Sequence, residues 1–390
     1  SKLYCGGVEP SDALRYGRMS KRLPSRLLQF SEDKKPVVVW NVTRACNLRC
    51  GHCYAHALPR GGGGDMSWDQ ARDLIDDLAA FGTPVVLLSG GEPLASPRIY
   101  RIAEYAVQSG LRAVLSTNGT LIDRACARRL ASLGLSYVGV SLDGLRAVND
   151  RFRGVGGAFE LALRGIRFCR EAGIKVGLRY TLTRENLPDL EGVFDLLVEE
   201  NIPRVCFYHL VATGRAANMS QHGLGLRETR AAVDEIIDWT AALHQRGLRK
   251  EVLTVDNHTD GPYLYLRMKR EGNRRSEKVM ELLNMTGGNS SGIGIGCVSW
   301  DGTVYADQFL RNHPLGNVCQ REFSRIWTDP GNRFLDMLRD KRRHIEGRCS
   351  ECRFFPVCAG NFRARAEAVT GNLWASDPAC YLTDEEIGIA

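Results

Sequence analysis

The stretch CNLRCGHCY, residues 46–54, follows a short apolar run and decides how the rest of the chain is interpreted. Its thiols belong to Cys46, Cys50 and Cys53. Three thiolates on one loop suit a soft metal centre, and an iron–sulfur cube is the usual occupant in a reducing compartment. Because a [4Fe–4S] cube has one more iron than this loop has thiols, one iron remains open to a ligand. A zinc knuckle completed by His52 or His56 is the alternative.

Composition and charge narrow the class of protein. The chain has 390 residues, which allows roughly two or three domains, and its 44% hydrophobic and 25% charged residues are ordinary for a globular protein. The net charge of +7 favours an acidic partner weakly and does not indicate nucleic acid. The 13 cysteines, several at C-x2-C spacing, indicate metal binding rather than disulfides. With no signal-like start and no long apolar run, we expect a soluble, cytoplasmic protein without a membrane span.

Six apolar runs are too short and too continuous for a helix face and predict buried strands. They are Val37–Thr43, Val85–Ser89, Ala113–Thr117, Tyr137–Leu142, Lys175–Thr181 and Arg204–Leu210. Helical patterns alternate with them. Ser67 opens one with a capping box that runs to about Phe81, and Ser96 with Pro97 predicts the start of another. Further helices are expected over 123–133, 159–172 and 187–199. Six βα units predict an α/β fold, an open partial (β/α)6 TIM barrel with active residues at the carboxyl ends of its strands.

Polar residues follow the predicted strands where active residues are expected. They are Gly90, Gly91, Glu92, Pro93, Thr117, Asn118, Ser141 and Asp143, with Arg179 on the fifth strand. Glycines let the backbone approach a ligand closely, and a carboxylate can accept a hydrogen bond from an ammonium group. Each turn alone is a common loop closure. Their recurrence at successive strand ends, after the cysteine loop, indicates a binding site.

A second cysteine array lies in the last hundred residues. Its members are Cys349, Cys352, Cys358 and Cys380. Four thiolates could ligate a cluster fully and leave no open position, and a helical pattern over 361–369 would bring the last one back to the others. Zinc bound by the same thiols is the alternative.

These features divide the chain into four parts. We expect an N-terminal extension (1–35), a partial barrel (36–215), a helical, basic connecting region (216–290) and a cluster domain (291–390). The connecting region contains Arg267, Lys269, Arg274 and Arg275. These cations form either a solvated helix face or a wall that faces a polycarboxylate substrate.

The C-x3-C-x2-C loop followed by Tyr54, with GGEP at residues 90–93, resembles the radical S-adenosylmethionine (radical SAM) superfamily. The resemblance implies that the loop thiolates hold a [4Fe–4S] cluster whose open iron binds SAM, and that an electron from the cluster cleaves SAM to a 5′-deoxyadenosyl radical. It implies that the GGEP motif holds the amino group of SAM. Ser141 and Asp143 would contact the ribose, Arg179 the carboxylate and Tyr54 the adenine.

The C-terminal array resembles the SPASM domain of radical SAM maturases. Cys349, Cys352, Cys358 and Cys380 match the ligands of its outer auxiliary cluster. Phe362 stands where the family's other auxiliary cluster has a cysteine. The resemblance therefore implies one auxiliary cluster, and two [4Fe–4S] clusters in the chain.

Stretches 2–16, 40–44, 296–300 and 307–313 are similar to the tetrapyrrole-modifying enzymes of the AhbC and NirJ type. The AhbC resemblance implies haem biosynthesis by removal of two acetate side chains from 12,18-didecarboxysiroheme, giving Fe-coproporphyrin III. NirJ-type removal of propionates in haem d1 biosynthesis, or peptide maturation by a SPASM enzyme, are the alternatives.

An iron tetrapyrrole substrate needs cations for its carboxylates and can take an axial ligand. On the substrate side we expect Arg311, His313 and Cys297, the last as a hydrogen-atom donor, a substrate contact or a buried structural thiol. His209 or His313 is a candidate axial ligand to the substrate iron, or else an ordinary hydrogen-bonding residue. An electron donor such as flavodoxin or ferredoxin completes the expected partners.

Overall fold

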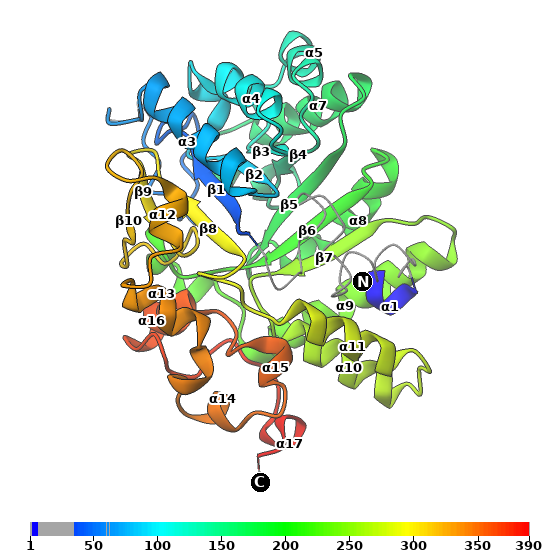
Figure 1. The fold of residues 1–390 in the computed structure, drawn as a ribbon. Helices are drawn as coiled ribbons and strands as arrows, with labels where there is room; N and C mark the ends of the chain where they lie inside the picture. Colours follow the sequence, from blue (N-terminus) through cyan, green and yellow to red (C-terminus); the bar gives the residue numbers. More distant parts are fainter. Residues whose placement is uncertain (1, 7–34, 60, 62, 390) are drawn as a thin grey trace.

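The computed structural model describes residues 2–6, 35–59, 61 and 63–389. Its core is a ten-stranded sheet in the order β10-β9-β8-β1-β2-β3-β4-β5-β6-β7. Strands β1 to β7 run parallel, β8 is parallel to β1, and β9 and β10 continue antiparallel. Figure 1 shows the sheet arching beneath helices α3, α4, α5 and α7, with the last helices gathered at the C-terminal end. The predicted α/β partial-barrel class is confirmed.

The first six strands lie on the six predicted apolar runs. The strands are β1 Val37–Asn41, β2 Val86–Ser89, β3 Ala113–Thr117, β4 Val138–Ser141, β5 Val176–Leu182, β6 Arg204–His209, β7 Glu251–Val255, β8 Ile295–Val298, β9 Thr303–Tyr305 and β10 Gly316–Asn317. The register pairs Val38 with Val86 and Val86 with Ala113. These β-branched and small residues are buried in the sheet, which is why the runs are continuously apolar.

The helices between the strands are amphipathic. The longer ones are α3 Trp68–Phe81, α4 Ile99–Gln108, α5 Arg124–Ser132, α6 Arg146–Arg153, α7 Ala158–Glu171, α8 Leu190–Glu199, α9 Leu226–Gln245, α10 Asp260–Arg270 and α11 Ser276–Thr286. The predicted capping box at Ser67 is present, with Gln70 as its partner. The predicted cap at Ser96 is wrong: α4 begins at Ile99, because Ser96 instead ends the short 3₁₀ turn Pro93–Ala95.

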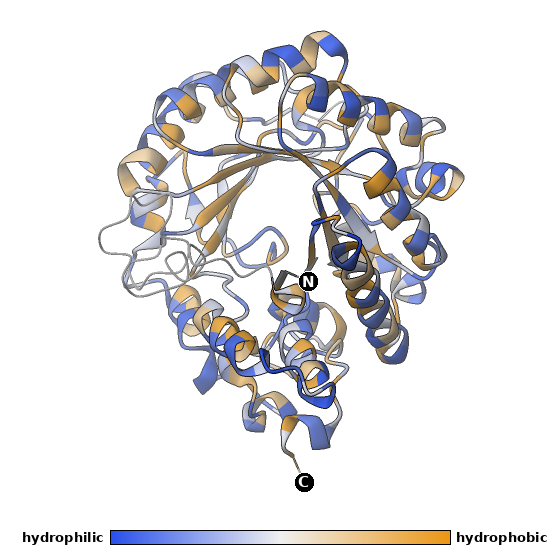
Figure 2. Ribbon diagram, turned by 90° about the vertical axis from the view of Figure 1, so that its right-hand side faces the viewer, coloured by the Kyte–Doolittle hydropathy of each residue, from blue (hydrophilic) through white to orange (hydrophobic). Residues whose placement is uncertain are grey.

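Apolar side chains fill the layer between sheet and helices. Figure 2 shows hydrophobic strands beneath helices whose outer faces are hydrophilic. Ile75 and Leu78 of α3 are fully buried, as are Leu88 of β2 and Leu115 of β3. Burial of each such side chain stabilises the fold by about 1.5–3 kcal/mol. This packed layer fixes the strand ends, and so the site residues that follow them.

The sheet is larger than the sequence predicted. β7 lies within the region expected to be a helical connection, and it pairs in parallel with β6 in the register Val205 to Val252. β8 belongs to the expected cluster domain, yet it pairs with β1 in the register Val39 to Cys297. The expected boundaries at 215 and 290 therefore do not divide the sheet. The run EVLTV of β7 is short and alternates polar with apolar residues, so its strand signal is weak beside that of the long helix α9.

The C-terminal part continues from β10 into small helices. They are α12 Phe323–Trp327, α13 Arg333–Arg339, α14 Arg348–Glu351, α15 Phe355–Cys358, α16 Arg363–Thr370 and α17 Asp384–Ile387. At the other end, α1 spans Lys2–Cys5 and packs on α9. Most of the expected extension 1–35 lies outside the described residues. Within the described part of the chain, no helix combines the length and apolarity needed to cross a membrane.

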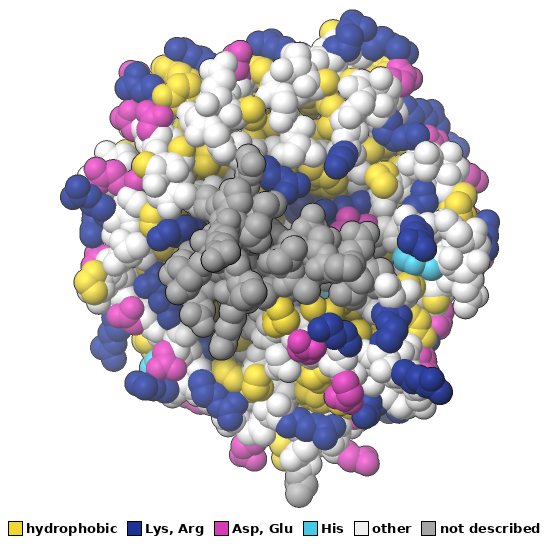
Figure 3. Space-filling model, turned by 45° about the vertical axis from the view of Figure 1, so that its right-hand side comes forward, with side chains coloured by type: hydrophobic (Ala, Val, Ile, Leu, Met, Phe, Trp, Pro, Cys, Tyr) yellow, Lys and Arg dark blue, Asp and Glu magenta, His cyan; other side chains and the backbone are white. Residues whose placement is uncertain are grey.

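The basic segment of the connecting region forms a surface face, which supports the first of its two interpretations. Arg267 pairs with Asp234, Asp238 and Glu271, and Lys269 lies 2.9 Å from Glu277. Arg275 donates to the backbone carbonyls of Leu3 and Tyr4. Figure 3 shows cationic and anionic side chains interspersed on this side of the molecule. For Arg267, Lys269 and Arg275 the expectation of a basic wall toward a substrate is not supported, because each has an acidic or backbone partner, and Arg274 is exposed.

Candidate active site

A cavity of about 1090 Å³, open to solvent, lies at the carboxyl ends of the parallel strands. It brings together ten of the predicted site residues. They are Cys46, Cys50, Cys53, Tyr54, Gly90, Gly91, Thr117, Asn118, Ser141 and Arg179. Parallel strands end at the same edge of a sheet, so residues separated by more than a hundred positions meet here.

The cysteine loop is held in place by two distant arginines that the sequence analysis missed. The backbone N–H of Arg49 donates to the carbonyl of Arg153 at the end of α6, at 3.0 Å. Arg215 donates from Nε to the carbonyl of Cys50 and from Nη1 to the carbonyl of Ala57, both at 2.9 Å. These contacts position the loop from both flanks.

Arg153 also places a positive charge beside the loop thiols. Its Nη1 atom lies 3.6 Å from Cys50 Sγ, and its Nη2 forms a buried ion pair with Asp143. Burial raises the pKa of the Cys50 thiol, and the Arg153 guanidinium counters that rise. Burial raises the pKa of Cys46 to about 12. Iron ligation requires thiolate, so the guanidinium favours the form that a cluster binds.

Asp143 and Glu92 were predicted to contact SAM, but both carboxylates lie behind the cavity wall. Asp143 accepts from the Thr181 N–H at 2.6 Å and pairs with Arg153. Glu92 is fully buried and accepts from Thr117 Oγ1 at 2.6 Å and from the Asn118 N–H at 2.7 Å. Both act on the site through the loops that they hold.

The GGEP turn, with Pro93 opening its 3₁₀ segment, packs directly on the chain before the cysteine loop. The Gly91 N–H donates to the Thr43 carbonyl at 2.8 Å, and a Cβ on Gly91 would lie 2.3 Å from the Ala45 carbonyl oxygen. Only glycine fits at this distance. Asn118, held by Glu92, donates to Asn47 Oδ1 at 2.9 Å within the loop. The motif thus ties the ends of β2 and β3 to the cysteine loop.

Two of the predicted substrate-side residues lie outside the cavity lining. Cys297 is fully buried and accepts a long 3.7 Å contact from Asn41, whose amide oxygen accepts from the Tyr54 hydroxyl at 3.0 Å. Asn41 therefore links Cys297 to the cavity residue Tyr54. His313 bonds Glu367 at 2.6 Å and is away from the cavity.

Arg311, the third predicted substrate-side residue, also lies outside the lining. Its Nη2 donates to Ser299 Oγ at 2.8 Å, and its guanidinium lies 5.0 Å from the ring of Trp300 and 5.1 Å from that of Tyr305. Nη1 is buried and has no hydrogen-bond partner among the described residues. A buried donor without a partner is costly, so this atom is suited to an anionic ligand.

Several residues of the cavity lining lie outside the motifs from which the SAM site was predicted. Tyr208, Asp256 and Gln308 were not predicted, whereas His52 was named as a possible zinc ligand and His209 as a candidate axial ligand. Asp256 follows β7 with φ 67°, a left-handed conformation that is uncommon outside glycine. Burial raises the pKa of its carboxyl to about 7, although Arg365 and Arg179 act to lower it. Its place after a parallel strand was the only available signal, and β7 itself was missed.

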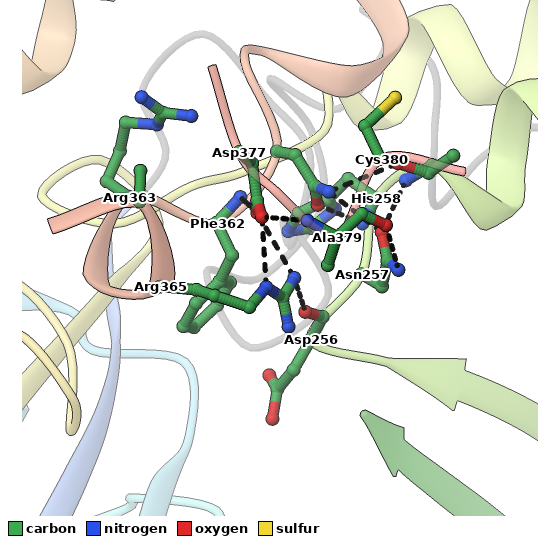
Figure 4. Close-up of polar contacts among 12 residues, drawn as sticks. Asp256, Asn257, His258, Phe362, Arg363, Arg365, Asp377, Ala379 and Cys380 are labelled. Carbon is green, nitrogen blue, oxygen red and sulfur yellow. Dashed lines mark hydrogen bonds and ion pairs between the residues drawn. The ribbon is translucent and has the colours of Figure 1, made fainter. Parts of the chain in front are cut away.

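A hydrogen-bonded network joins Asp256 to the C-terminal part. Arg365 donates to the Asp256 carbonyl at 2.8 Å and pairs with Asp377 at 3.0 Å. Asn257 donates to the carbonyl of Ala379 at 3.2 Å. Figure 4 shows the Asp256 carboxylate pointing away from these partners. The loop after β7 is therefore fixed by residues that precede Cys380.

The four C-terminal thiols meet at a second, smaller pocket of about 380 Å³. Its lining includes Cys349, Cys352, Cys358 and Cys380, with apolar Phe354, Phe355, Leu382 and Ile387. The Asn361 N–H donates to the Cys358 carbonyl at 3.2 Å, and the Cys380 N–H to the Asp377 carbonyl at 3.1 Å. The pocket is set apart from the large cavity.

Both sites suit the clusters that the sequence suggests. Three thiols on one wall of a large cavity fit a cluster with an accessible iron, and four thiols around a smaller, apolar pocket fit a fully ligated one. A single zinc ion would hold its sulfurs about 2.3 Å from one point. Across the described residues, no three His, Cys, Asp or Glu side chains are arranged to hold a single metal ion.

Two family models match the chain. The radical SAM superfamily model matches residues 40–197, and the SPASM iron-sulfur cluster-binding domain model matches residues 295–353. The first range begins at the end of β1 and contains the cysteine loop and strands β2 to β5, and the second begins at β8 and includes Cys349 and Cys352.

Whole-chain relatives extend this match. The Fe-coproporphyrin III synthase of Methanosarcina barkeri (strain Fusaro / DSM 804) is 59% identical over 391 residues, covering 100% of this chain and 98% of that protein. The pre-heme d1 synthase of Dinoroseobacter shibae (strain DSM 16493 / NCIMB 14021 / DFL 12) is 40% identical over 91% of this chain and 88% of that protein. The crystal structure of Streptococcus suis SuiB bound to precursor peptide SuiA has a TM-score of 0.72 at 18% identity, covering 96% of this chain and 82% of that chain, and shows a shared fold.

Membership of these families brings their cofactors with it. The chain uses SAM and [4Fe–4S] clusters, with an auxiliary cluster in the SPASM domain. The identity to both tetrapyrrole enzymes exceeds 30% over nearly the whole chain. The chain therefore belongs to the radical SAM superfamily, in the SPASM-containing group of tetrapyrrole-modifying enzymes that includes the Fe-coproporphyrin III and pre-heme d1 synthases.

Proposed function

We propose that this enzyme removes two acetate side chains from 12,18-didecarboxysiroheme to give Fe-coproporphyrin III. The observation that carries the proposal is the 59% identity, over the full length, to a protein named Fe-coproporphyrin III synthase. Loss of acetate from an sp³ ring carbon lets the conjugation of the macrocycle extend, which gives the reaction a driving force.

The cysteines have separate tasks in this proposal. Cys46, Cys50 and Cys53 hold the SAM-binding cluster, and Cys349, Cys352, Cys358 and Cys380 hold the auxiliary one. When bound, SAM and the reduced cluster supply a carbon radical that abstracts hydrogen. Backbone at Gly90 and Gly91, the hydroxyl of Ser141 and the guanidinium of Arg179 hold SAM, while Glu92 and Asp143 position those loops.

The remaining cavity residues orient the substrate. Arg179 lies over the Tyr208 ring at 4.6 Å, and among the described residues no hydrogen bond or ion pair satisfies its guanidinium. That guanidinium is available to the carboxylate of SAM, and Arg311 offers its buried, unpartnered Nη1 to a ring carboxylate. A neutral Asp256 carboxyl can donate a hydrogen bond to a carboxylate without repelling it. The protein's part is to place one side chain near the radical source and to exclude other hydrogen donors.

Removal of propionates is the second candidate, because the pre-heme d1 synthase is also similar at 40% identity. The higher identity to the Fe-coproporphyrin III synthase favours acetate removal. We further propose that a small acidic electron carrier, such as flavodoxin or ferredoxin, reduces the clusters in the cytoplasm. The net charge of +7 and the free thiols support this assignment.

The test is an anaerobic assay of reconstituted protein with SAM, reductant and 12,18-didecarboxysiroheme, followed by mass spectrometry. We expect successive loss of two acetate units together with formation of 5′-deoxyadenosine. Loss of propionates instead would favour the second candidate. Absence of any tetrapyrrole product, with modification of a peptide, would overturn both.

A further inference from the structure

His209 is one of two histidines in the described chain that line the large cavity. It ends β6, and its side chain is only 6% exposed. Its Nε2 atom lies 2.9 Å from Oδ2 of Asp260, the first residue of α10. The other oxygen of Asp260 accepts from the Tyr381 hydroxyl at 2.7 Å. A carboxylate fixed from two sides therefore holds the imidazole in one orientation.

This contact decides which ring nitrogen is available. Asp260 accepts from the Tyr381 hydroxyl at one oxygen and faces the His209 ring at the other, as an ionised carboxylate does. An ionised carboxylate only accepts hydrogen bonds, so Nε2 carries the proton. The neutral ring then has its lone pair on Nδ1, for which no hydrogen bond is found among the residues described.

The two other candidate imidazoles lack this combination. His52 lines the cavity but belongs to the cysteine loop and stacks on Phe152. Its Nε2 lies 3.6 Å from Asp143 Oδ2, beyond hydrogen-bond distance, and its buried Nδ1 has no partner among the described residues. His313 has a carboxylate partner in Glu367 but lies away from the cavity. Histidines that ligate metals almost always donate their second ring N–H to a carboxylate, carbonyl or water. Among the described histidines, only His209 both lines the cavity and lies within hydrogen-bond distance of a carboxylate.

We propose that His209 ligates the iron of the tetrapyrrole substrate through Nδ1, with Asp260 as the positioning residue. This inference rests on the proposed function and adds a substrate contact to it. A single axial bond fixes the centre of the macrocycle while leaving rotation about the iron–nitrogen axis. Two acetates could thus be presented in turn to the cysteine-loop side of the cavity without release of the ring.

The test titrates Fe-coproporphyrin III, the expected product, into anaerobic holoprotein and records visible and EPR spectra. We expect the low-spin ferric signal of an imidazole ligand in the wild type. His209→Ala should lose it, bind the iron form about 10–100-fold more weakly, and regain the signal with added imidazole. His313→Ala should match the wild type. Iron-free coproporphyrin III should bind wild type and His209→Ala equally.

A wild-type spectrum and affinity in His209→Ala would overturn the inference, while conversion of didecarboxysiroheme would leave the proposed function standing. Failure of the wild type to bind any of these tetrapyrroles would overturn both. Iron content and SAM binding report whether the variant folds. If His209→Ala does not fold, Asp260→Asn is tested in its place. Weaker binding of Fe-coproporphyrin III with a shifted absorption maximum would support the assignment, and an unchanged spectrum would contradict it.

Discussion

The two cysteine sites of this enzyme differ in what surrounds the sulfur atoms. The first presents three thiols to an open cavity of about 1090 Å³ that is lined by polar residues from successive strands. The second encloses four thiols in a pocket of about 380 Å³ with apolar walls. The comparison teaches that the fold sets the size and lining of a cluster site: the strand ends bring polar side chains to a large cavity, and the short helices surround a smaller pocket with apolar ones.

Each site also has a buried Arg–Asp pair, and the two pairs do different things. In the first, Arg153 pairs with Asp143 and reaches the Cys50 thiol. In the second, Arg365 pairs with Asp377 and reaches the carbonyl of Asp256 rather than a thiol. The first pair acts on a metal ligand, and the second fastens the cluster domain to the barrel.

The largest effect is expected from removing the thiols of one site at a time. Replacement of Cys46, Cys50 and Cys53 by alanine should halve the iron content from about eight atoms per chain and abolish SAM cleavage. Replacement of Cys349, Cys352, Cys358 and Cys380 should also halve the iron but retain SAM binding. Iron analysis and SAM titration of anaerobically reconstituted protein measure this. Equal loss of SAM binding in both variants would erase the distinction between the sites.

A smaller effect is expected from the first ion pair. Arg153→Met leaves Asp143 buried without its cation, which should lower the free energy of unfolding by about 3–5 kcal/mol. Adding Asp143→Asn to this variant should restore most of the lost free energy of unfolding, because no uncompensated buried charge remains. Denaturant unfolding of both variants makes the measurement. If the single variant is as stable as wild type, the pair is not a structural element of the cysteine loop.

The smallest effect concerns Asp256, which lies between the two sites. Its folded pKa of about 7 exceeds the ordinary value of 3.8, so between these values the folded state holds a proton that the unfolded chain has released. Stability should therefore fall as pH rises toward 7, by up to about 1.4 kcal/mol per pH unit. Denaturant unfolding from pH 5.5 to 8 should show a flatter dependence in Asp256→Asn. Parallel curves would contradict the assignment.

The sequence predicted the repeating parts of the molecule and missed those made by distant partners. The strand over 113–117 could be predicted because a strand buried on both faces needs continuous apolar residues. The helix start at Ser67 could be predicted because a capping box involves only neighbouring residues. The role of Arg153 could not be predicted, because it depends on contact with Cys50, about a hundred positions earlier in the chain. Glu92 was assigned to the ligand because its motif is visible, whereas its bonds to Thr117 and Asn118 exist only in the fold.

The pairing of β8 with β1 has a consequence for the chain as a unit. β1 leads into the cysteine loop, and its two neighbours are β2 from the barrel and β8 from the cluster domain. A chain that stopped before residue 290 would expose β1 as a bare sheet edge, which invites aggregation. The two halves are thus not interchangeable modules: neither could be lost, swapped or inherited alone without rebuilding the strand on which the other depends.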